Sequence, residues 1–327
     1  MWLQVRLYLL VALMFAILYG IIAGIGYLVG LRGVGYFSGL LVFAGFLIFI
    51  QYMIGPKTVE WSMRVRYVDE NQYPKLHRMV EELAEKANIP KPRIGVSEIE
   101  IPNAFAFGRS KRDARVCVTK GLLRILDDEE LKAVLGHEIS HIVHRDVAII
   151  TMLSVIPMIC YMIYISFFWS GMFYGRRDRE AGLTILVGLA ALILYFVTSL
   201  LVMYGSRIRE YYADFGSVKL GNQPSKLATA LYKLVYSNAK SDKRHIAKAA
   251  GSKAFFINDP SKAAYEIREL SQIDIDMSGT IDPDELRMLR EKKIKLSMAD
   301  KIVELLSSHP NMLKRIKQLA SLEKEGT

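Results

Sequence analysis

The sequence predicts a mainly helical protein with a small β-sheet, in which long apolar helices alternate with two amphipathic blocks. Four stretches contain no Asp, Glu, Lys or Arg, and each exceeds the roughly 20 apolar residues that a helix needs to cross a bilayer. These stretches are residues 7–31, 33–56, 147–175 and 181–206. The two remaining blocks show mostly helical periodicity, with short strand-like runs in the first block only.

We therefore predict four transmembrane helices, two in residues 1–56 and two in 147–206, and one domain built from residues 57–146 and 207–327. An even number of spans puts both termini and both blocks on the same side of the membrane. All but four of the 43 Lys and Arg residues fall on that side. The positive-inside rule assigns it to the cytoplasm. The exceptions are Arg32, Arg176, Arg177 and Arg179, of which the last three form one discordant cluster.

The formal net charge of +10 is explained by the same arrangement. Basic residues beside the inner leaflet attract anionic lipid. No RNA- or DNA-binding signature accompanies them, so we expect the lipid bilayer and no nucleic acid as a partner. Cys117 and Cys160 lie in separate parts of the chain, which fits a reducing compartment without disulfides.

The first block is expected to contain two helices and three strands. Helical spacing covers residues 74–88, and acidic residues at 127–130 open a second helix that continues to His144. Strand-like runs occupy 93–96, 103–107 and 115–119, and a polar turn between the last two predicts a hairpin. The second block reads as four helices, over residues 224–240, 260–272, 283–293 and 298–322.

His137, Glu138 and His141 form a His-Glu-x-x-His motif within the expected helix. Residues four apart share a helix face, so both imidazoles can reach one zinc ion. Glu138 follows the first histidine directly and can act as general base towards water held by the metal. His144 is better explained as an interfacial histidine than as a ligand.

A catalytic zinc site needs a third protein ligand. His141 lies about 9 Å along a helix before the third apolar stretch, and Glu210 lies about 6 Å beyond the fourth. An antiparallel pair of spans therefore brings both to similar depths. Asp214 follows one turn later on the same face, and depth alone leaves Glu210 and Asp214 both open.

Three motifs together resemble the HtpX-type heat-shock proteases, which are membrane-bound zinc metallopeptidases of family M48. The motifs are Asn103-Ala-Phe-Ala, His-Glu-Ile-Ser-His at 137–141 and Arg209-Glu-Tyr-Tyr-Ala-Asp214. The resemblance covers nearly the whole chain. It implies a cytoplasmic, zincin-like metallopeptidase domain, with Glu210 as the third zinc ligand and Asp214 orienting a ligand histidine. The alternative for Glu210 is a surface ion pair with Arg207 or Arg209.

The resemblance implies two further roles. Ser308-His309-Pro310 is similar to a Thr-His-Pro element of the family, which would let His309 donate a hydrogen bond to the oxyanion. A helix break before Pro310 explains the same residues. Residues Asn103, Ala104 and Phe105 resemble the edge strand beside the zinc, which can hold an extended substrate through its backbone.

The expected function is cleavage of misfolded or damaged membrane proteins, a substrate class that the resemblance implies. One alternative is another M48 activity, such as prenyl-protein processing, and another is a catalytically dead membrane scaffold. An intact Glu138 argues against the scaffold, which has no need of a base.

Residues 274–285 match a twelve-residue EF-hand loop and predict a possible Ca²⁺ site. Oxygen donors occupy the ligand positions, and Gly279 stands at the turn position. The donors are Asp274, Asp276, Ser278, Thr280 through its carbonyl, Asp282 and Glu285. The alternative is an acidic turn followed by a helix that begins at Asp282-Pro283.

Overall fold

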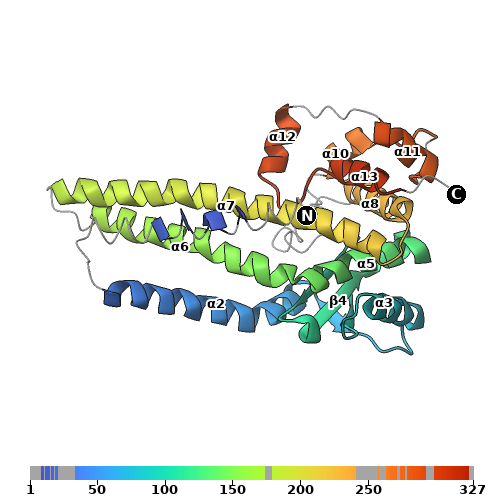
Figure 1. Cartoon of the computed structure of the whole chain (residues 1–327), viewed down its shortest axis with the longest axis horizontal. Coiled ribbons are helices and arrows are strands. Elements are labelled where there is room, and N and C mark those ends of the chain that lie inside the picture. The colour runs from blue at the N-terminus through green and yellow to red at the C-terminus, as the bar shows by residue number, and fades with distance from the viewer. Residues whose placement is uncertain are drawn as a thin grey trace. The chain divides into compact units, whose positions relative to one another are not determined.

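The computed structural model describes residues 9–10, 12–14, 16–17, 19–20, 34–173, 179–240, 257, 263–270, 273–276, 278–291 and 298–323. They form long helices, a cluster of shorter helices and one small sheet (Figure 1). The helices are α2 (Val34–Ser62), α3 (Pro74–Lys86), α4 (Lys120–Ile125), α5 (Asp128–His144), α6 (Asp146–Phe173), α7 (Arg179–Lys219), α8 (Pro224–Lys240), α10 (Ala263–Leu270), α11 (Pro283–Glu291), α12 (Met298–Leu305) and α13 (Met312–Ala320). The strands are β1 (Val65–Tyr67), β2 (Arg93–Ser97), β3 (Ala104–Gly108) and β4 (Ala114–Thr119), with a short 3₁₀ turn at Lys111–Asp113.

The chain divides into two compact units, and each is assembled from two separate segments. One unit comprises Met1–Met53 and Ala148–Ile208, and the other comprises Ile54–Val147 and Arg209–Thr327. The first contains the apolar helices, and the second contains the sheet and the shorter helices.

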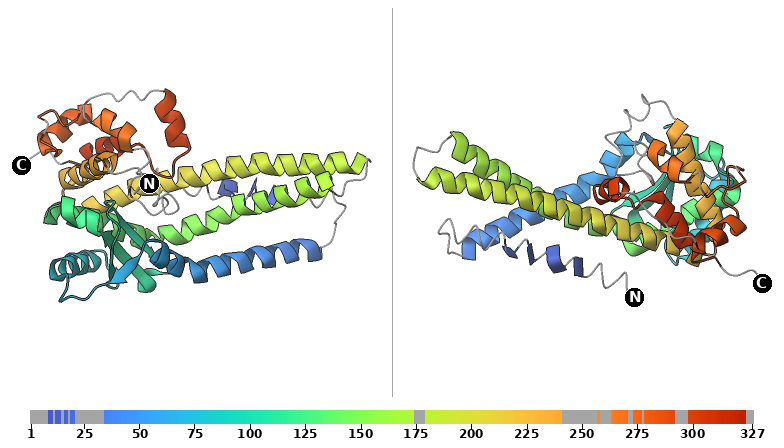
Figure 2. Two further views of the ribbon diagram at one scale, coloured as in Figure 1. Left: turned by 180° about the vertical axis from the view of Figure 1, so that it is seen from behind. Right: turned by 90° about the horizontal axis from the view of Figure 1, so that it is seen from above.

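Helices α6 and α7 lie side by side in the first unit (Figure 2). Gly188 of α7 approaches the backbone of Phe168 closely, and the rings of Tyr161 and Tyr195 lie 5.5 Å apart. Among the described residues, Thr184–Lys219 is the one helix long and apolar enough to cross a membrane, and Leu153–Phe168 is a shorter apolar helix. The first predicted span falls mostly outside the described residues, so four spans stay a prediction.

The second unit contains a four-stranded sheet in the order β1-β2-β4-β3. Strand β2 runs parallel to β4, and β3 pairs antiparallel with β4, which confirms the predicted hairpin. Strand β1 was not predicted, because three residues show no alternation that a pattern can detect. Strand β3 forms one edge of the sheet.

Helix α5 lies between the sheet and the C-terminal helices (Figure 1). It begins with a capping box, in which Asp127 accepts a hydrogen bond from the Glu130 N–H and Glu130 accepts one from the Asp127 N–H. It ends at Arg145, whose φ of 56° is left-handed. The helix is buried along most of its length because α3, β3, β4 and α8 all contact it.

Helices α5 and α7 approach each other closely within the second unit. A methyl group at Gly216 of α7 would collide with the Ser140 side chain of α5, so this contact requires glycine. One residue later, the Ser217 hydroxyl donates to the Ala133 carbonyl at 2.6 Å. This close approach sets the distance between the histidines of α5 and the segment of α7 that contains Glu210.

Helices α8, α10, α11 and α13 pack on one another. The predicted helix over 298–322 is wrong in its middle, because the chain forms α12 and α13 with a break between them. Pro310 lies in the break, and Asn311 caps α13 by accepting a hydrogen bond from the Leu313 N–H at 3.0 Å. The helix predicted at 260–272 is described over 263–270 and that at 283–293 over 283–291; their remaining residues lie outside the described residues.

Candidate metal centre

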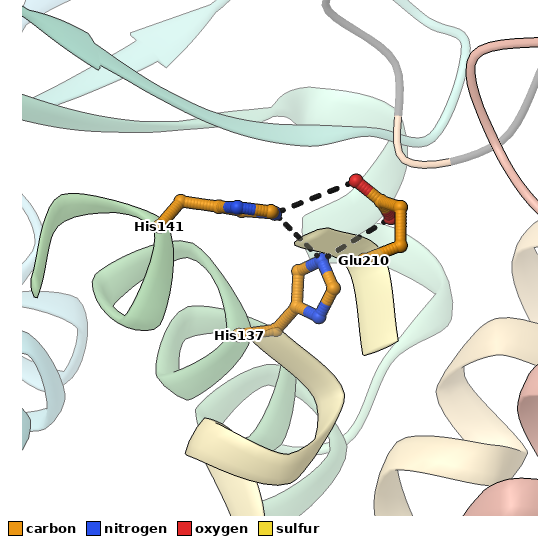
Figure 3. A group of neighbouring side chains, drawn as sticks. All are labelled: His137, His141 and Glu210. Carbon is orange, nitrogen blue, oxygen red and sulfur yellow. Dashed lines mark hydrogen bonds and ion pairs between the residues drawn. The ribbon is translucent and has the colours of Figure 1, made fainter. Parts of the chain in front are cut away.

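The side chains of His137, His141 and Glu210 point toward one another from α5 and α7 (Figure 3). The two Nε2 atoms lie 3.1 Å apart. Each is 3.6 Å from a different oxygen of the Glu210 carboxylate. All three side chains belong to the second unit, and His137 and Glu210 are almost completely buried.

These separations fit a metal ion. Ligand atoms about 2.0–2.2 Å from a tetrahedral zinc ion lie about 3.3 Å from one another. The Glu210 Oε2 atom is buried and accepts no hydrogen bond, although the Arg315 guanidinium is 3.0 Å away. Two imidazole nitrogens and a carboxylate oxygen form a donor set that zinc binds in catalytic sites.

An aspartate lies against the far ring nitrogen of each histidine. Nδ1 of His137 is 2.9 Å from Asp214 Oδ1, and Nδ1 of His141 is 2.6 Å from Asp146 Oδ2. A carboxylate in that position holds the proton on Nδ1 and leaves the lone pair of Nε2 available to a metal. Both rings are thus fixed in the tautomer and orientation that a ligand requires.

The two histidines differ in their electrostatics. Burial lowers the pKa of His137, but the neighbouring carboxylates of Asp214 and Glu210 outweigh that effect and raise the pKa to about 9. Burial lowers the pKa of His141 to about 4, and the adjacent His137 acts in the same direction. Without a metal, the two carboxylates therefore favour a proton on His137, whereas burial disfavours one on His141.

Glu138 is buried close to His137, His141 and Glu210. The backbone N–H of Ala106, in β3, donates a hydrogen bond to its carboxylate. Burial raises the pKa of Glu138, and the nearby charges of His141 and His137 oppose that increase. A carboxylate whose pKa is raised toward neutrality is a stronger base, as general catalysis requires.

The structure reveals two charged residues that sequence reasoning missed. Arg315 of α13 is wholly buried and forms a bidentate pair with Asp214, with distances of 2.6 and 2.9 Å. Arg315 lies on the apolar face of α13, among its buried residues. An arginine at such a position needs a buried acidic partner, so the sequence pattern of this helix could have indicated the pair. Asp146 pairs with Arg209 as well as with His141, and its position just after α5 carries no comparable signal.

Two neighbours of the site, Arg209 and His144, form interactions with residues other than Glu210. Arg209 contacts Asp146 and donates to the His144 carbonyl, so the surface ion pair considered for Glu210 does not form with it. His144 itself is hydrogen-bonded to Ser140 and lies outside the ligand group.

His309 lies in the break between α12 and α13, close to the ligands. Its Nδ1 atom is 3.5 Å from Glu210 Oε2. Both ring nitrogens are buried and form no hydrogen bond. The ring therefore has donor capacity near Glu210 that no group of the described residues satisfies, and His309 also belongs to the helix break at Pro310.

The predicted substrate strand lies beside Glu138, but its three residues differ in availability. Asn103 is buried, and its backbone N–H and carbonyl are both bonded to Thr119. The alternation of an antiparallel ladder then points the backbone groups of Phe105 toward β4 and those of Ala104 and Ala106 away from β4, at the edge of the sheet. Asn103 anchors the strand, and its side chain also accepts from the Ile257 N–H at 2.9 Å.

The acidic loop at residues 274–285 forms a second group of carboxylates, within the second unit. One oxygen each of Asp274, Asp276 and Glu285 lies within 4.8 Å of the others. Ser278, Thr280 and Asp282 form hydrogen bonds inside the loop. Asp282 also caps α11 by accepting from the Glu285 N–H at 2.8 Å, so the capped helix considered as the alternative is present.

The chain belongs to peptidase family M48, whose sequence model matches residues 70–323. Three similar proteins all carry the description protease HtpX homolog. The protein from Methanothermobacter thermautotrophicus is 55% identical over 233 residues, which cover 71% of this chain and 86% of the relative. The one from Moorella thermoacetica is 36% identical over 295 residues, with 90% and 86% coverage. The one from Pyrococcus furiosus is 35% identical over 301 residues, with 90% and 98% coverage.

Among solved structures, the crystal structure of S. mikatae Ste24p aligns with a TM-score of 0.49 at 17% identity, covering 96% of this chain and 67% of that one.

Proposed function

We propose that this protein is an integral membrane, zinc-dependent endopeptidase that cleaves misfolded or damaged membrane proteins at the cytoplasmic face. The observation that carries the proposal is the group of His137, His141 and Glu210, in which each histidine turns Nε2 inward and is held by an aspartate at Nδ1. A scaffold protein needs neither this arrangement nor a buried glutamate beside it.

The roles of the residues follow from their positions. When bound, zinc supplies a Lewis acid and lowers the pKa of a coordinated water to about 7. Glu138 accepts the proton of the attacking water and returns it to the leaving amine. His309 donates a hydrogen bond to the oxyanion that develops on the substrate carbonyl. Asp214, Asp146 and Arg315 keep the ligands in place.

The open edge of β3 supports an extended, unfolded substrate. The backbone groups of Ala104 and Ala106 point toward that edge, and the Ala106 N–H already reaches Glu138. A peptide that pairs with the edge would pass beside the base. Backbone pairing of this kind is independent of side chains, so it favours unfolded segments over particular sequences.

Exposed apolar side chains support the membrane location. Large apolar residues of α2 and α7 that lie in the first unit are exposed, as expected for surfaces that face lipid. They include Val42, Phe46, Phe49, Leu186, Ile193 and Phe196. We propose four spans, with both termini and residues 57–146 and 207–327 in the cytoplasm, because positive charge is concentrated in those segments.

The test is the substitution Glu138→Gln in the full chain purified in detergent. The variant should retain zinc, because no ligand is changed, and should lose casein hydrolysis by at least about 100-fold, because the proton acceptor is gone. Zinc is measured by elemental analysis. Glu129→Gln is a matched control, since Glu129 is exposed on the same helix and pairs at the surface with Lys226.

Cleavage by Glu138→Gln within a few-fold of the wild type would contradict the proposed base, and absence of zinc in the wild type would contradict the metal. A prenylated peptide offered beside casein distinguishes the substrate classes. Preference for the prenylated peptide would replace the proposed substrate with prenyl-protein processing.

A further inference from the structure

We propose that residues 274–285 bind one calcium ion, at a site separate from the metal centre formed by His137, His141 and Glu210. The loop presents carboxylates at its first, third, ninth and twelfth positions, a hydroxyl at its fifth and a carbonyl at its seventh. This is the oxygen set that calcium takes from a twelve-residue EF-hand loop. The proposal is independent of the peptidase activity.

Three carboxylates of the loop are close together and have no positive partner among the described residues. One oxygen each of Asp274, Asp276 and Glu285 lies within 4.8 Å of the others. Among the described residues, no lysine or arginine forms an ion pair with any of these three. Three negative charges at such distances repel one another, and a divalent cation between them removes that repulsion.

A buried oxygen atom in this group has no hydrogen-bond partner. Asp274 is only 5% exposed, and its Oδ2 atom accepts from the Tyr232 hydroxyl at 2.9 Å and from the Gly279 N–H at 3.0 Å. Its Oδ1 atom is buried and accepts no hydrogen bond. A buried carboxylate oxygen in this condition is unfavourable unless a cation coordinates it. This observation does not depend on the sequence motif.

The backbone of the loop already has the turn that the motif requires. Gly279 occupies the sixth position with a φ of 79°, a conformation that side chains disfavour. Glu285 lies in the first turn of α11, where its two oxygens accept from the N–H groups of Ile275 and Asp282. Both ends of the loop are therefore held near the same carboxylate, which is the twelfth-position ligand of the motif.

The loop is hydrogen-bonded to helix α8 of the same unit. Ile281, at the eighth position, is buried, and the Thr229 hydroxyl both accepts from its N–H at 3.0 Å and donates to its carbonyl at 2.9 Å. Tyr232, three residues further along α8, holds Asp274. These hydrogen bonds fix the positions of Asp274 and Ile281 relative to α8. Helix α8 also packs against α5 and α13, so a cation bound in the loop stabilises the folded second unit.

The experiment is a calcium titration of the full chain in detergent, followed by thermal unfolding, with magnesium as the comparison ion. At a calcium concentration about ten times Kd, the wild type should melt roughly 3–5 °C higher. Magnesium should give a smaller increase, since it needs near-ideal octahedral geometry. Direct calorimetry with CaCl₂ should give one site per chain.

Matched variants make the result specific to the loop. Glu285→Gln should abolish most of the increase, and Asp276→Asn should do the same at an exposed position where folding is not at risk. Asp284→Asn is the control, because Asp284 is exposed at the non-ligand eleventh position and pairs with Arg287. It should respond to calcium like the wild type, and zinc content should be equal in all variants.

Three results would overturn the proposal. The first is no increase in the wild type, and the second is an equal increase in wild type, Glu285→Gln and Asp276→Asn. The third is an equal loss of response in Asp284→Asn, which would show a general effect of acidic charge rather than a site. Any of these would leave a capped helix at this loop.

Discussion

Glu210 and Asp214 are both buried carboxylates of α7, four residues apart, yet their neighbours differ. The oxygens of Glu210 lie 3.6 Å from the Nε2 atoms of both histidines. Asp214 instead contacts Nδ1 of His137 and is bonded twice to Arg315. At the scale of single residues, these positions support the proposal that Glu210 is a metal ligand and that Asp214 orients His137.

This assignment predicts unequal effects of two isosteric substitutions. Glu210→Gln should lower zinc affinity by more than about 100-fold, because a ligand charge is lost, whereas Asp214→Asn should lower it by about 10–100-fold. Competition with a chromophoric chelator measures both. Glu129→Gln should leave the affinity unchanged. A larger loss in Asp214→Asn than in Glu210→Gln would show that the roles are exchanged.

At the scale of elements, the Arg315 side chain of α13 contacts the candidate metal centre. Arg315 is fully buried and pairs with Asp214 and Glu210 of α7, while Nη2 lies 3.5 Å from His137 Nδ1 of α5. The positive guanidinium lowers the pKa of Asp214 and holds that of Glu210 well below its usual range, in both cases against the effect of burial. Both carboxylates therefore stay ionised because α13 is in place.

We predict that Arg315→Met destabilises the metal-free protein by about 3–5 kcal/mol, because it leaves two buried carboxylates without their counter-charge. Arg315→Lys should recover only part of the loss, since an ammonium cannot form the bidentate pair. Denaturant unfolding of the full chain in detergent measures both. Lys314→Met, on the same helix, should change stability by less than about 1 kcal/mol. An Arg315→Met variant as stable as the wild type would exclude this role.

The elements that the sequence predicts well are those with a local signal. The capping box at Asp127 and Glu130 marks the start of α5, and the polar turn marks the β3–β4 hairpin. The prediction of one helix over 298–322 is wrong because apolar periodicity continues on both sides of Pro310. Periodicity alone does not show that proline lacks the backbone N–H that a helix interior requires.

Much of the site could be proposed from the sequence, because the His-Glu-x-x-His spacing depends only on helix geometry. The choice of Glu210 over Asp214 needed either a resemblance or coordinates, since both lie on one helix face. Arg315 and Asp146 are tertiary partners, and no spacing rule relates them to residues far along the chain or beyond a helix end. The parts that were missed are thus the supports of the ligands rather than the ligands.

At the scale of the whole molecule, the chain alternates twice between an apolar segment and a charged one. The same alternation divides the structure into two units, each made of two segments. The α7 helix is continuous from the apolar unit into the unit that holds Glu210. Glu210 thus lies in α7 four residues beyond the last apolar stretch, which ends at residue 206, and this position fits the proposed cleavage of substrates at a membrane surface.

The four-span proposal makes a definite prediction about topology. With an even number of spans, fusions at either terminus lie in the cytoplasm, whereas a reporter inserted between residues 176 and 179 lies on the other side. In a bacterial host, green fluorescent protein at each terminus should fluoresce. Alkaline phosphatase, which needs disulfides that form only outside the cytoplasm, should be active at 176–179 and inactive at the C-terminus. Active phosphatase at the C-terminus would reverse the orientation, and termini on opposite sides would require an odd number of spans. A C-terminus outside the cytoplasm would exclude the proposed site of cleavage, because Glu210 follows the last apolar stretch by only four residues and would lie on the same side as the C-terminus. A cytoplasmic C-terminus with the N-terminus on the other side would overturn the four-span proposal alone.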